Sequence, residues 1–225
     1  GAPDEDQMAL SAACSLARKM ELCDYEMARV RDNYSAPSCR NKAVADFLKR
    51  PDFTHLWFVD DDVTVQPDAL SILMSADKPI AAGGYPQVRH FKGERPSELY
   101  ITVQVEEGWF RGWFDGEVKA KGAGTGCMLI KRDVLEAVGF PWFRWPEFMN
   151  GNGEHSELSD DVDFCERARQ KGFDTYAYGR VRCGHLKMSD LACWIGHAKD
   201  PLPVSGWDGP KTATEQLKRE GKPCK

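Results

Sequence analysis

Three consecutive carboxylates, Asp60, Asp61 and Asp62, follow directly on an apolar run that begins at His55. Alternate side chains of an extended segment share a face, so Asp60 and Asp62 point to one side and Asp61 to the other. Two carboxylates at this spacing can hold a divalent cation, and their hard oxygen atoms suit Mg2+ or Mn2+. Because Asp-x-Asp is a short pattern, a solvated acidic turn accounts for it equally well.

A second acidic group follows Ser159 and consists of Asp160, Asp161 and Asp163. Ser159 predicts a helix cap, and acids in the first turn of a helix are favoured by its dipole without any further function. The preceding segment, residues 151–155, contains two glycines and is expected to be mobile. A carboxylate beside such a lid is a candidate general base, so both interpretations stay open for Asp160 and Asp161.

The segment 122–126, Gly-Ala-Gly-Thr-Gly, invites comparison with a dinucleotide-binding fingerprint. However, its third glycine falls one residue early, and it leads into a predicted strand where that fingerprint leads into a helix. The better interpretation is a surface of Gly124, Thr125 and Gly126 that lets a flat sugar ring approach the backbone closely.

Single histidines and aromatic clusters carry weaker signals. His185 follows the last predicted strand, but a lone histidine is most often a packed or surface residue, and none of the other four histidines has a stronger claim. The aromatic clusters at residues 109–114 and 142–148 are more often core than ligand platform. Their tryptophans nevertheless leave ring surface on which a sugar can stack.

Length, charge and composition restrict the class of protein. A chain of 225 residues fits one domain, or one domain with an appendage, and can bury a substantial core. A formal net charge of -5 argues against a nucleic acid as the main partner. No apolar stretch approaches the ~20 residues of a membrane helix. The start at Gly1, Ala2 and Pro3 hides any targeting segment.

The eight cysteines favour a reducing compartment. None belongs to a Cys-x-x-Cys pair, which argues against a zinc module. An even number of cysteines would fit disulfides in a secreted protein, but a chain of this length does not need them. Because Cys127 and Cys165 lie among apolar neighbours, we expect buried free thiols in a cytoplasmic protein.

Helical and strand periods alternate along the chain, which predicts an α/β fold with helices on both faces of a mixed, mostly parallel central sheet. The predicted helices cover residues 7–20, 41–49, 67 onward, 133–139 and 159–171. The predicted strands cover residues 25–30, 55–59, 79–82, 127–130 and 176–181. Residues 98–121 alternate in polarity and predict a small antiparallel meander, whereas residues 141–152 are expected to form a loop.

This arrangement places Asp60 to Asp62 at the carboxyl end of a central strand, where open α/β sheets bind their ligands. The pattern weakens beyond residue 188. We therefore expect a domain of residues 1–188 and a C-terminal tail of residues 189–225 that packs on it or extends from it.

Together, these segments resemble the inverting GT-A-fold glycosyltransferases of the large family that includes cellulose and chitin synthases. The likeness is greatest to the small bacterial and phage-type members, and it spans residues 3–187. Its marks occur in the family's order: Arg40-Asn41, then residues 58–62, 124–132, 141–143, 160–165 and 184–187. The resemblance implies a GT-A, Rossmann-like fold.

The resemblance also implies a role for each matching residue. It assigns donor binding to Asp60, Asp61, Arg40, Asn41 and Pro3. It assigns metal binding to Asp62, Asp60 and His185. It places the catalytic base at Asp161, with Asp160 beside it, and substrate contacts at Gly124, Thr125, Gly126 and Trp142. Asp160 stands where the family usually has glutamate. The first strand, which normally holds part of the nucleotide base, is reduced to residues 1–3, so part of that site is expected to be missing.

The implied reaction moves a sugar from a UDP- or GDP-linked donor to an unidentified acceptor hydroxyl, with inversion and with Mn2+ or Mg2+. The cation would neutralise the leaving diphosphate, and Asp161 would take the acceptor proton. Two other classes stay open. A metal-dependent nucleotidyltransferase or hydrolase would use the three acids without a sugar acceptor. A catalytically silent carbohydrate-binding module would bind sugars through its tryptophans without a metal.

Overall fold

The computed structural model describes residues 5–30, 35–89, 98–149 and 151–186 of the chain. These residues belong to one compact unit, formed by residues 1–92 and 97–187. Pro3, His90, His197 and the predicted tail lie outside the described residues. The division into a domain and a tail therefore stays a prediction.

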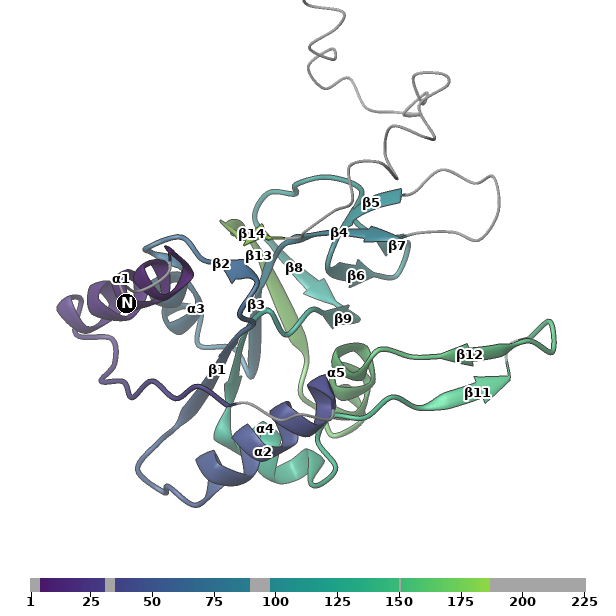
Figure 1. The fold of residues 1–225 in the computed structure, drawn as a ribbon, viewed down its shortest axis with the longest axis horizontal. Coiled ribbons are helices and arrows are strands. Elements are labelled where there is room, and N and C mark those ends of the chain that lie inside the picture. Colours follow the sequence, from purple (N-terminus) through teal and green to yellow (C-terminus); the bar gives the residue numbers. More distant parts are fainter. Residues whose placement is uncertain (1–4, 31–34, 90–97, 150, 187–225) are drawn as a thin grey trace, which may run out of the picture. The chain divides into compact units, whose positions relative to one another are not determined.

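A five-stranded sheet forms the centre of this unit (Figure 1). In spatial order its strands are β1 (His55–Val59), β10 (Cys127–Lys131), β3 (Ile80–Gly84), β13 (Thr175–Arg182) and β8 (Glu117–Ala120). The pair β3/β13 is parallel, whereas β1/β10, β10/β3 and β13/β8 are antiparallel. The prediction of a mostly parallel sheet is therefore wrong. A strand buried on both faces has the same apolar sequence whichever way its neighbours run, so its sequence does not reveal their direction.

The strands β1, β3 and β13 nevertheless run in the same direction. Both β1 and β3 lie antiparallel to β10, and β13 lies parallel to β3. Their carboxyl ends therefore meet at one edge of the sheet, together with the amino end of β10. The acids after β1, Tyr85 after β3 and the residues after β13 all reach this edge. The expected grouping of functional residues thus does not require a mostly parallel sheet.

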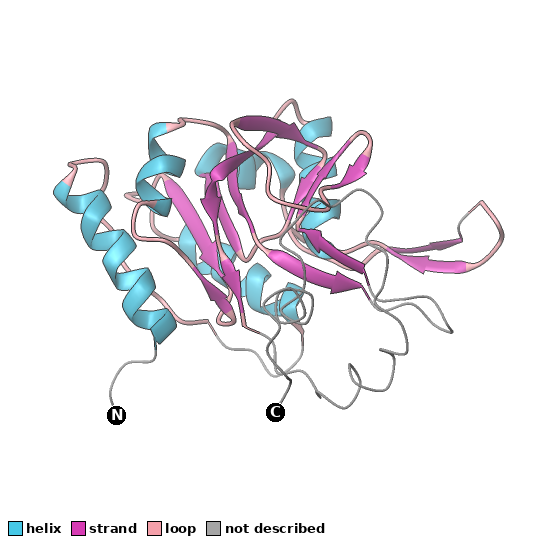
Figure 2. Ribbon diagram, turned by 90° about the horizontal axis from the view of Figure 1, so that it is seen from above, coloured by secondary structure: helices cyan, strands magenta, loops and turns pink. Residues whose placement is uncertain are grey.

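Helices cover both faces of the sheet, as predicted (Figure 2). The helices α2 (Ala36–Leu48), α4 (Arg132–Val138) and α5 (Asp160–Gln170) pack on one face. On the other face lies α3 (Ala69–Ser75), with α1 (Glu5–Lys19) packed against it. Alternate residues of β10 face opposite cores: Met128 and Ile130 face the first group, and Cys127 and Leu129 the second. Cys127 and Cys165 are buried free thiols, as predicted.

Several short antiparallel pairs surround the edge of the main sheet. The strand β4 (Pro86–Arg89) pairs with β5 (Glu98–Ile101), and β6 (Val103–Val105) pairs with β7 (Gly108–Trp109) and β9 (Gly122–Ala123). The strand β2 (Val63–Thr64) pairs with β14 (Gly184–His185). Of the antiparallel meander predicted over residues 98–121, only the β6/β7 hairpin pairs within that range, because β5 pairs with β4 and β8 belongs to the central sheet.

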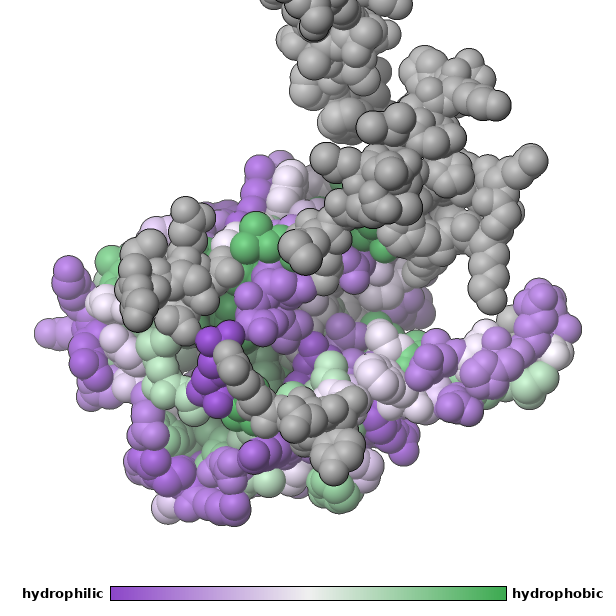
Figure 3. All heavy atoms as spheres, in the orientation of Figure 1, coloured by the Kyte–Doolittle hydropathy of each residue, from purple (hydrophilic) through white to green (hydrophobic). Residues whose placement is uncertain are grey.

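Two segments differ from the prediction. Residues 25–30 have no regular secondary structure, since no strand among the described residues pairs with them. Part of the predicted loop forms a hairpin of β11 (Glu147–Met149) and β12 (His155–Glu157), and Gly153 supplies a left-handed φ of 75° near its tip. Figure 3 shows hydrophilic and hydrophobic side chains mixed along this hairpin. The segment expected to form a mobile lid is thus the tip of a hairpin.

Candidate functional site

The pairing of β2 with β14 brings His185 beside Asp62. His185 lies opposite Val63 in this pair, and the backbone N–H of Leu186 donates to the carbonyl oxygen of Asp62 at 2.8 Å. The Nε2 atom of His185 lies 3.2 Å from Oδ2 of Asp62. Two of the residues assigned to a metal are therefore in contact, although they lie 123 positions apart in the sequence.

The hydrogen bonds of His185 fit a cation site. Its Nδ1 atom lies 2.7 Å from the carbonyl oxygen of Pro86, which can only accept, so Nδ1 carries the proton. In the neutral imidazole, Nε2 then presents a lone pair to the Asp62 carboxylate. A proton held by either group, or a cation next to both atoms, would make this contact favourable. The 3.2 Å separation also fits neighbouring ligands of a six-coordinate ion, which lie about 3 Å apart.

The ligand set is small. Within the part of the chain that the structure describes, no group of three or more His, Cys, Asp or Glu side chains is placed to hold a metal ion. Asp60, the third predicted ligand, instead contacts Arg40. A site with Asp62 and His185 as its protein ligands would leave coordination positions for phosphate oxygens and water around a divalent cation.

Arg40 bridges the two acidic groups of the sequence. The helix α2 begins at Ala36, earlier than predicted, because the Ser35 hydroxyl caps it by accepting a hydrogen bond from the N–H of Ser38. From this helix, Nη1 of Arg40 donates to Oδ2 of Asp160 at 2.6 Å, and Nη2 donates to Oδ2 of Asp60 at 3.0 Å. The side chains of Arg40 and Asp160 are 13% and 5% exposed, whereas that of Asp60 is 33% exposed.

Charge balance at Arg40 follows from these contacts. Burial on its own would lower the pKa of Arg40, but the carboxylates of Asp60 and Asp160 outweigh burial and raise it. Arg40 therefore stays a cation and compensates the buried charge of Asp160. Both Nη atoms of Arg40 already donate to these two carboxylates. Donor binding by Arg40 therefore stays a prediction.

Asp161 is half-buried at the start of α5. Its Oδ1 atom accepts hydrogen bonds from the Ser159 hydroxyl at 2.5 Å and from the N–H of Val162 at 2.8 Å. We expect from the sequence that the helix start favours the ionised carboxylate. Burial is the largest influence and raises the pKa of Asp161, whereas the N–H of Val162 at the helix start acts in the expected direction and lowers it. A raised pKa brings this carboxyl closer to the range in which a general base is effective.

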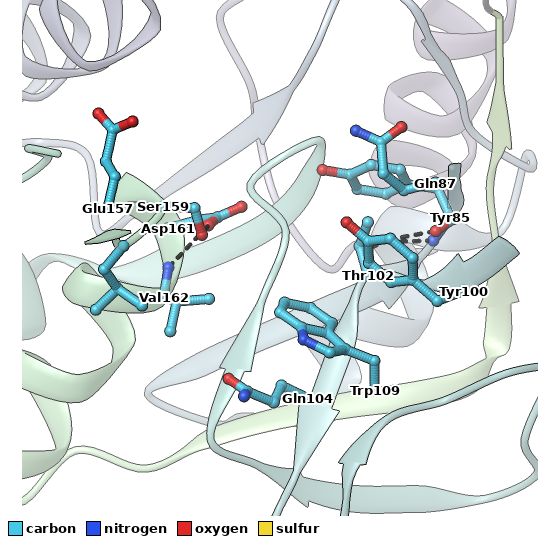
Figure 4. A pocket seen from close by; sticks show the side chains of 11 residues that line it. Tyr85, Gln87, Tyr100, Thr102, Gln104, Trp109, Glu157, Ser159, Asp161 and Val162 are labelled. Carbon is cyan, nitrogen blue, oxygen red and sulfur yellow. Dashed lines mark hydrogen bonds between the residues drawn. The ribbon is translucent and has the colours of Figure 1, made fainter. Parts of the chain in front are cut away.

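Asp161 lines a cavity of about 360 Å³ (Figure 4). In Figure 4, Glu157, Ser159, Asp161 and Val162 form one wall, and side chains from residues 85–109 form the wall that faces them. The facing wall consists of Tyr85, Gln87, Tyr100, Thr102, Gln104 and Trp109. Hydroxyl, amide and carboxyl groups surround this space beside aromatic rings, which is the lining of a site for a polar organic ligand.

The facing wall is the part of the site that the motifs missed. The sequence contains one indication of this wall, the alternation of polar and apolar residues after residue 98. This alternation places Tyr100, Thr102 and Gln104 on one face of an extended segment. The sequence does not reveal that this face points toward Asp161. Tyr85 and Gln87 carried no signal, because they lie in a segment without a recognisable motif.

The glycines of segment 122–126 make room for Tyr85. A Cβ atom on Gly124 would lie 2.3 Å from the Tyr85 hydroxyl oxygen, and one on Gly126 would lie 2.8 Å from the ring. The N–H of Gly126 donates to that hydroxyl at 3.3 Å, and Thr125 is fully buried beside it. The space next to these glycines is thus filled by Tyr85. The close approach of a sugar ring to this segment stays a prediction.

Three other predicted residues have structural contacts. The side-chain amide of Asn41 donates to the carbonyl oxygen of Phe143 at 2.7 Å and accepts from its N–H at 3.0 Å. Trp142 is buried, and its indole N–H donates to the carbonyl oxygen of Leu135 at 2.8 Å. These contacts do not support sugar stacking on Trp142, because its ring belongs to the core. Asp61 is 84% exposed, and its Oδ2 atom lies 3.9 Å from Nη2 of Arg29.

Comparison with known proteins identifies the family of this chain. The sequence profile of the family described as "Glycosyltransferase like family 2" matches residues 11–196 of the chain. The chain belongs to this family. The predicted family is thereby confirmed, and the segments that carried the resemblance all lie within or beside the matched range.

Among curated proteins, this glycosyltransferase family member is similar to "Galactofuranosyltransferase GlfT2" of Mycobacterium tuberculosis (strain ATCC 25618 / H37Rv), with 22% identity over 93% of the chain. The chain spans 35% of that relative, about a third of its length. Among solved structures, A197 from STIV matches with a TM-score of 0.47, 23% identity and 79% coverage of each chain. GalNAc-T7 with UDP, GalNAc and Mn2+ matches with a TM-score of 0.46, 11% identity and coverage of 72% and 32%.

Within the described ranges, no helix of this family member is long and apolar enough to cross a membrane.

Proposed function

We propose that this protein transfers a sugar from a nucleoside-diphosphate sugar to an acceptor hydroxyl, with inversion and with Asp161 as the general base. The observation that carries the proposal is the position of Asp161, a half-buried carboxyl with a raised pKa in the wall of a polar cavity. Family membership supports the class of reaction. The UDP- or GDP-linked donor is part of the proposal.

In the proposed step, the acceptor oxygen attacks the anomeric carbon while the bond from that carbon to the diphosphate oxygen breaks. The hydroxyl proton passes to Asp161, and the diphosphate leaves with the bonding electron pair. The Oδ1 atom of Asp161 is held by Ser159 and Val162. Both of these hydrogen bonds from described residues end on Oδ1, so Oδ2 is the atom that takes the proton.

The donor side of the site would lie at the edge formed by Asp60, Asp62 and His185. Asp62 and His185 would hold a divalent cation, which would supply positive charge next to the leaving diphosphate. Arg40 holds the Asp60 carboxylate at 3.0 Å and so fixes its orientation beside that edge. Because the Arg40 side chain is largely buried, it holds the Asp60 carboxylate rigidly.

The test is turnover by Asp161→Asn with a panel of UDP- and GDP-sugars, monitored by nucleotide release and product mass. We expect a loss of about 10²–10⁴-fold with donor binding retained. The matched control is Asp133→Asn, because Oδ1 of Asp133 accepts from the N–H of the next residue at 2.9 Å, as Asp161 does, but at the start of α4. The control variant should keep wild-type activity.

Two outcomes contradict the proposal. A first-formed glycoside with the donor's own anomeric configuration, measured by NMR, would rule out inversion and remove the need for this base. Nucleotide release that is independent of any acceptor would instead support a hydrolase.

A further inference from the structure

We infer that the acceptor is a neutral glycan of at least two sugar units, bound across Tyr100 and Trp109. This inference rests on the proposed function, because it names the acceptor of the same site. It is carried by a second hollow next to the cavity that contains Asp161. The second hollow has a volume of about 210 Å³ and is lined by Glu98, Tyr100, Glu107, Gly108, Trp109 and Arg111.

Tyr100 and Trp109 are shared by the two hollows. Both residues line the cavity of Asp161 and both line the second hollow, so the two spaces are neighbours. Their ring centroids lie 5.2 Å apart, with the ring planes at 62°. In Figure 4 the two rings lie next to each other on the wall opposite Asp161. A ligand that is too long for the first hollow can therefore extend past these rings into the second.

Backbone geometry fixes this pair of rings. Tyr100 lies on β5 and Trp109 on β7, and both side chains are half-buried. Gly108 precedes Trp109 and has a φ of 126°, a conformation that side-chain-bearing residues rarely adopt. The first residue of β7, next to Trp109, therefore favours glycine. Rings held in this way provide rigid apolar faces for the C–H faces of sugars.

The polar lining disfavours an anionic ligand. The first hollow contains the amides Gln87 and Gln104 together with the carboxyls of Glu157 and Asp161. The second contains Glu98 and Glu107, and Arg111 forms an ion pair with Glu98. Among the described residues that line the two hollows, Arg111 is the one cation, and its charge is already offset. An anionic acceptor such as a phosphorylated lipid headgroup would be repelled, whereas sugar hydroxyls can pair with amides and carboxylates.

The volumes indicate more than one sugar unit. Pockets for small organic ligands measure about 300–1,000 Å³. The first hollow lies at the lower end of that range and the second lies below it, so the second is not a complete site on its own. A monosaccharide acceptor would occupy the space beside Asp161 and leave the second hollow to water. A disaccharide would fill both.

The test compares matched mono-, di- and trisaccharides of glucose, galactose, mannose and N-acetylglucosamine as acceptors for the full chain. For the sugar that the protein accepts, kcat/KM for the disaccharide should exceed kcat/KM for the monosaccharide by about tenfold or more. This is the gain expected from additional hydrogen bonds to charged groups. The trisaccharide should add little. Binding of the same sugars on a glycan array gives a second measurement that does not depend on transfer.

Variants of the second hollow test whether its residues cause the preference for the disaccharide. Arg111→Ala and Glu107→Ala should reduce kcat/KM for the disaccharide to near that for the monosaccharide. Trp113→Ala is the matched control, because this tryptophan belongs to the same segment, is 44% exposed and lines neither hollow. The control should keep the full preference for the disaccharide.

The outcomes separate the two proposals. Transfer with equal kcat/KM for mono- and disaccharides, or transfer to a phosphorylated lipid in preference to any glycan, overturns the inference and leaves the proposed function in place. Absence of transfer with every acceptor overturns the proposed function. In that case, stronger array binding of the disaccharide than of the monosaccharide still supports a two-unit glycan site, and equal binding refutes it.

Discussion

Replacing Arg40 by methionine removes the cation that contacts both Asp60 and Asp160. The Asp160 side chain is only 5% exposed, so water cannot take the place of the lost guanidinium. Breaking a buried ion pair by removing one partner costs about 3–5 kcal/mol, because it leaves an uncompensated buried charge. The contact with Asp60 adds little to this, since that carboxylate is 33% exposed and can be hydrated. We therefore expect Arg40→Met to lower the free energy of unfolding by about 3–5 kcal/mol.

Urea unfolding of Arg40→Met, Asp160→Asn and the double variant measures this effect. The double variant should lose less stability than the sum of the single variants, because the second substitution removes the uncompensated charge. Arg50→Met is the matched control: Arg50 also contacts two carboxylates, Glu26 and Asp52, but it lies on the surface and should lose far less stability. A loss below about 1 kcal/mol for Arg40→Met, or strict additivity in the double variant, would refute the reasoning.

Three further predictions concern the same edge of the sheet. Asp161→Asn should make the protein more stable than wild type at neutral pH, because burial raises the folded-state pKa of Asp161 and so penalises its ionised form. The advantage should disappear as the pH falls through the folded-state pKa to ~3.9 and below, and equal urea midpoints at neutral pH would contradict it. Asp62→Asn and His185→Ala should each remove most of the Mn2+-dependent thermal shift with UDP or GDP, and equal nucleotide binding by wild type in chelator would exclude a metal site. Gly124→Ala should lower unfolding stability by about 1–3 kcal/mol through overpacking, whereas Gly112→Ala, where a Cβ atom meets nothing within 4 Å, should change it little.

Local patterns predicted most of the elements but not their directions. The helices at residues 7–20 and 159–171 were predicted within a few residues, because cap residues and apolar periodicity are local signals. The direction of β10 could not be predicted. Its residues, Cys127–Lys131, would have the same apolar sequence in a parallel or an antiparallel sheet.

The candidate site shows the same limit. Alternation places Asp60 and Asp62 on one face, and the resemblance implied a place for His185, so these residues could be named in advance. The bridge from Arg40 to Asp160 spans 120 positions and has no local signal. The raised pKa of Asp161 likewise depends on burial by distant segments, which outweighs the helix start that the sequence reveals.

The wall that carries Tyr100 and Trp109 and the edge that carries Asp62 and His185 are built from different sheets, and this has a consequence for how the protein can be altered. Tyr100 lies on β5 and Trp109 on β7, which belong to two small sheets, whereas Asp62 and His185 follow β1 and β13 of the central sheet. Exchange of residues on that wall therefore leaves the strand ladder of the central sheet intact. Libraries that vary the β5–β7 segment should yield folded proteins with new ligand preferences, whereas libraries at the sheet edge should mostly yield inactive ones.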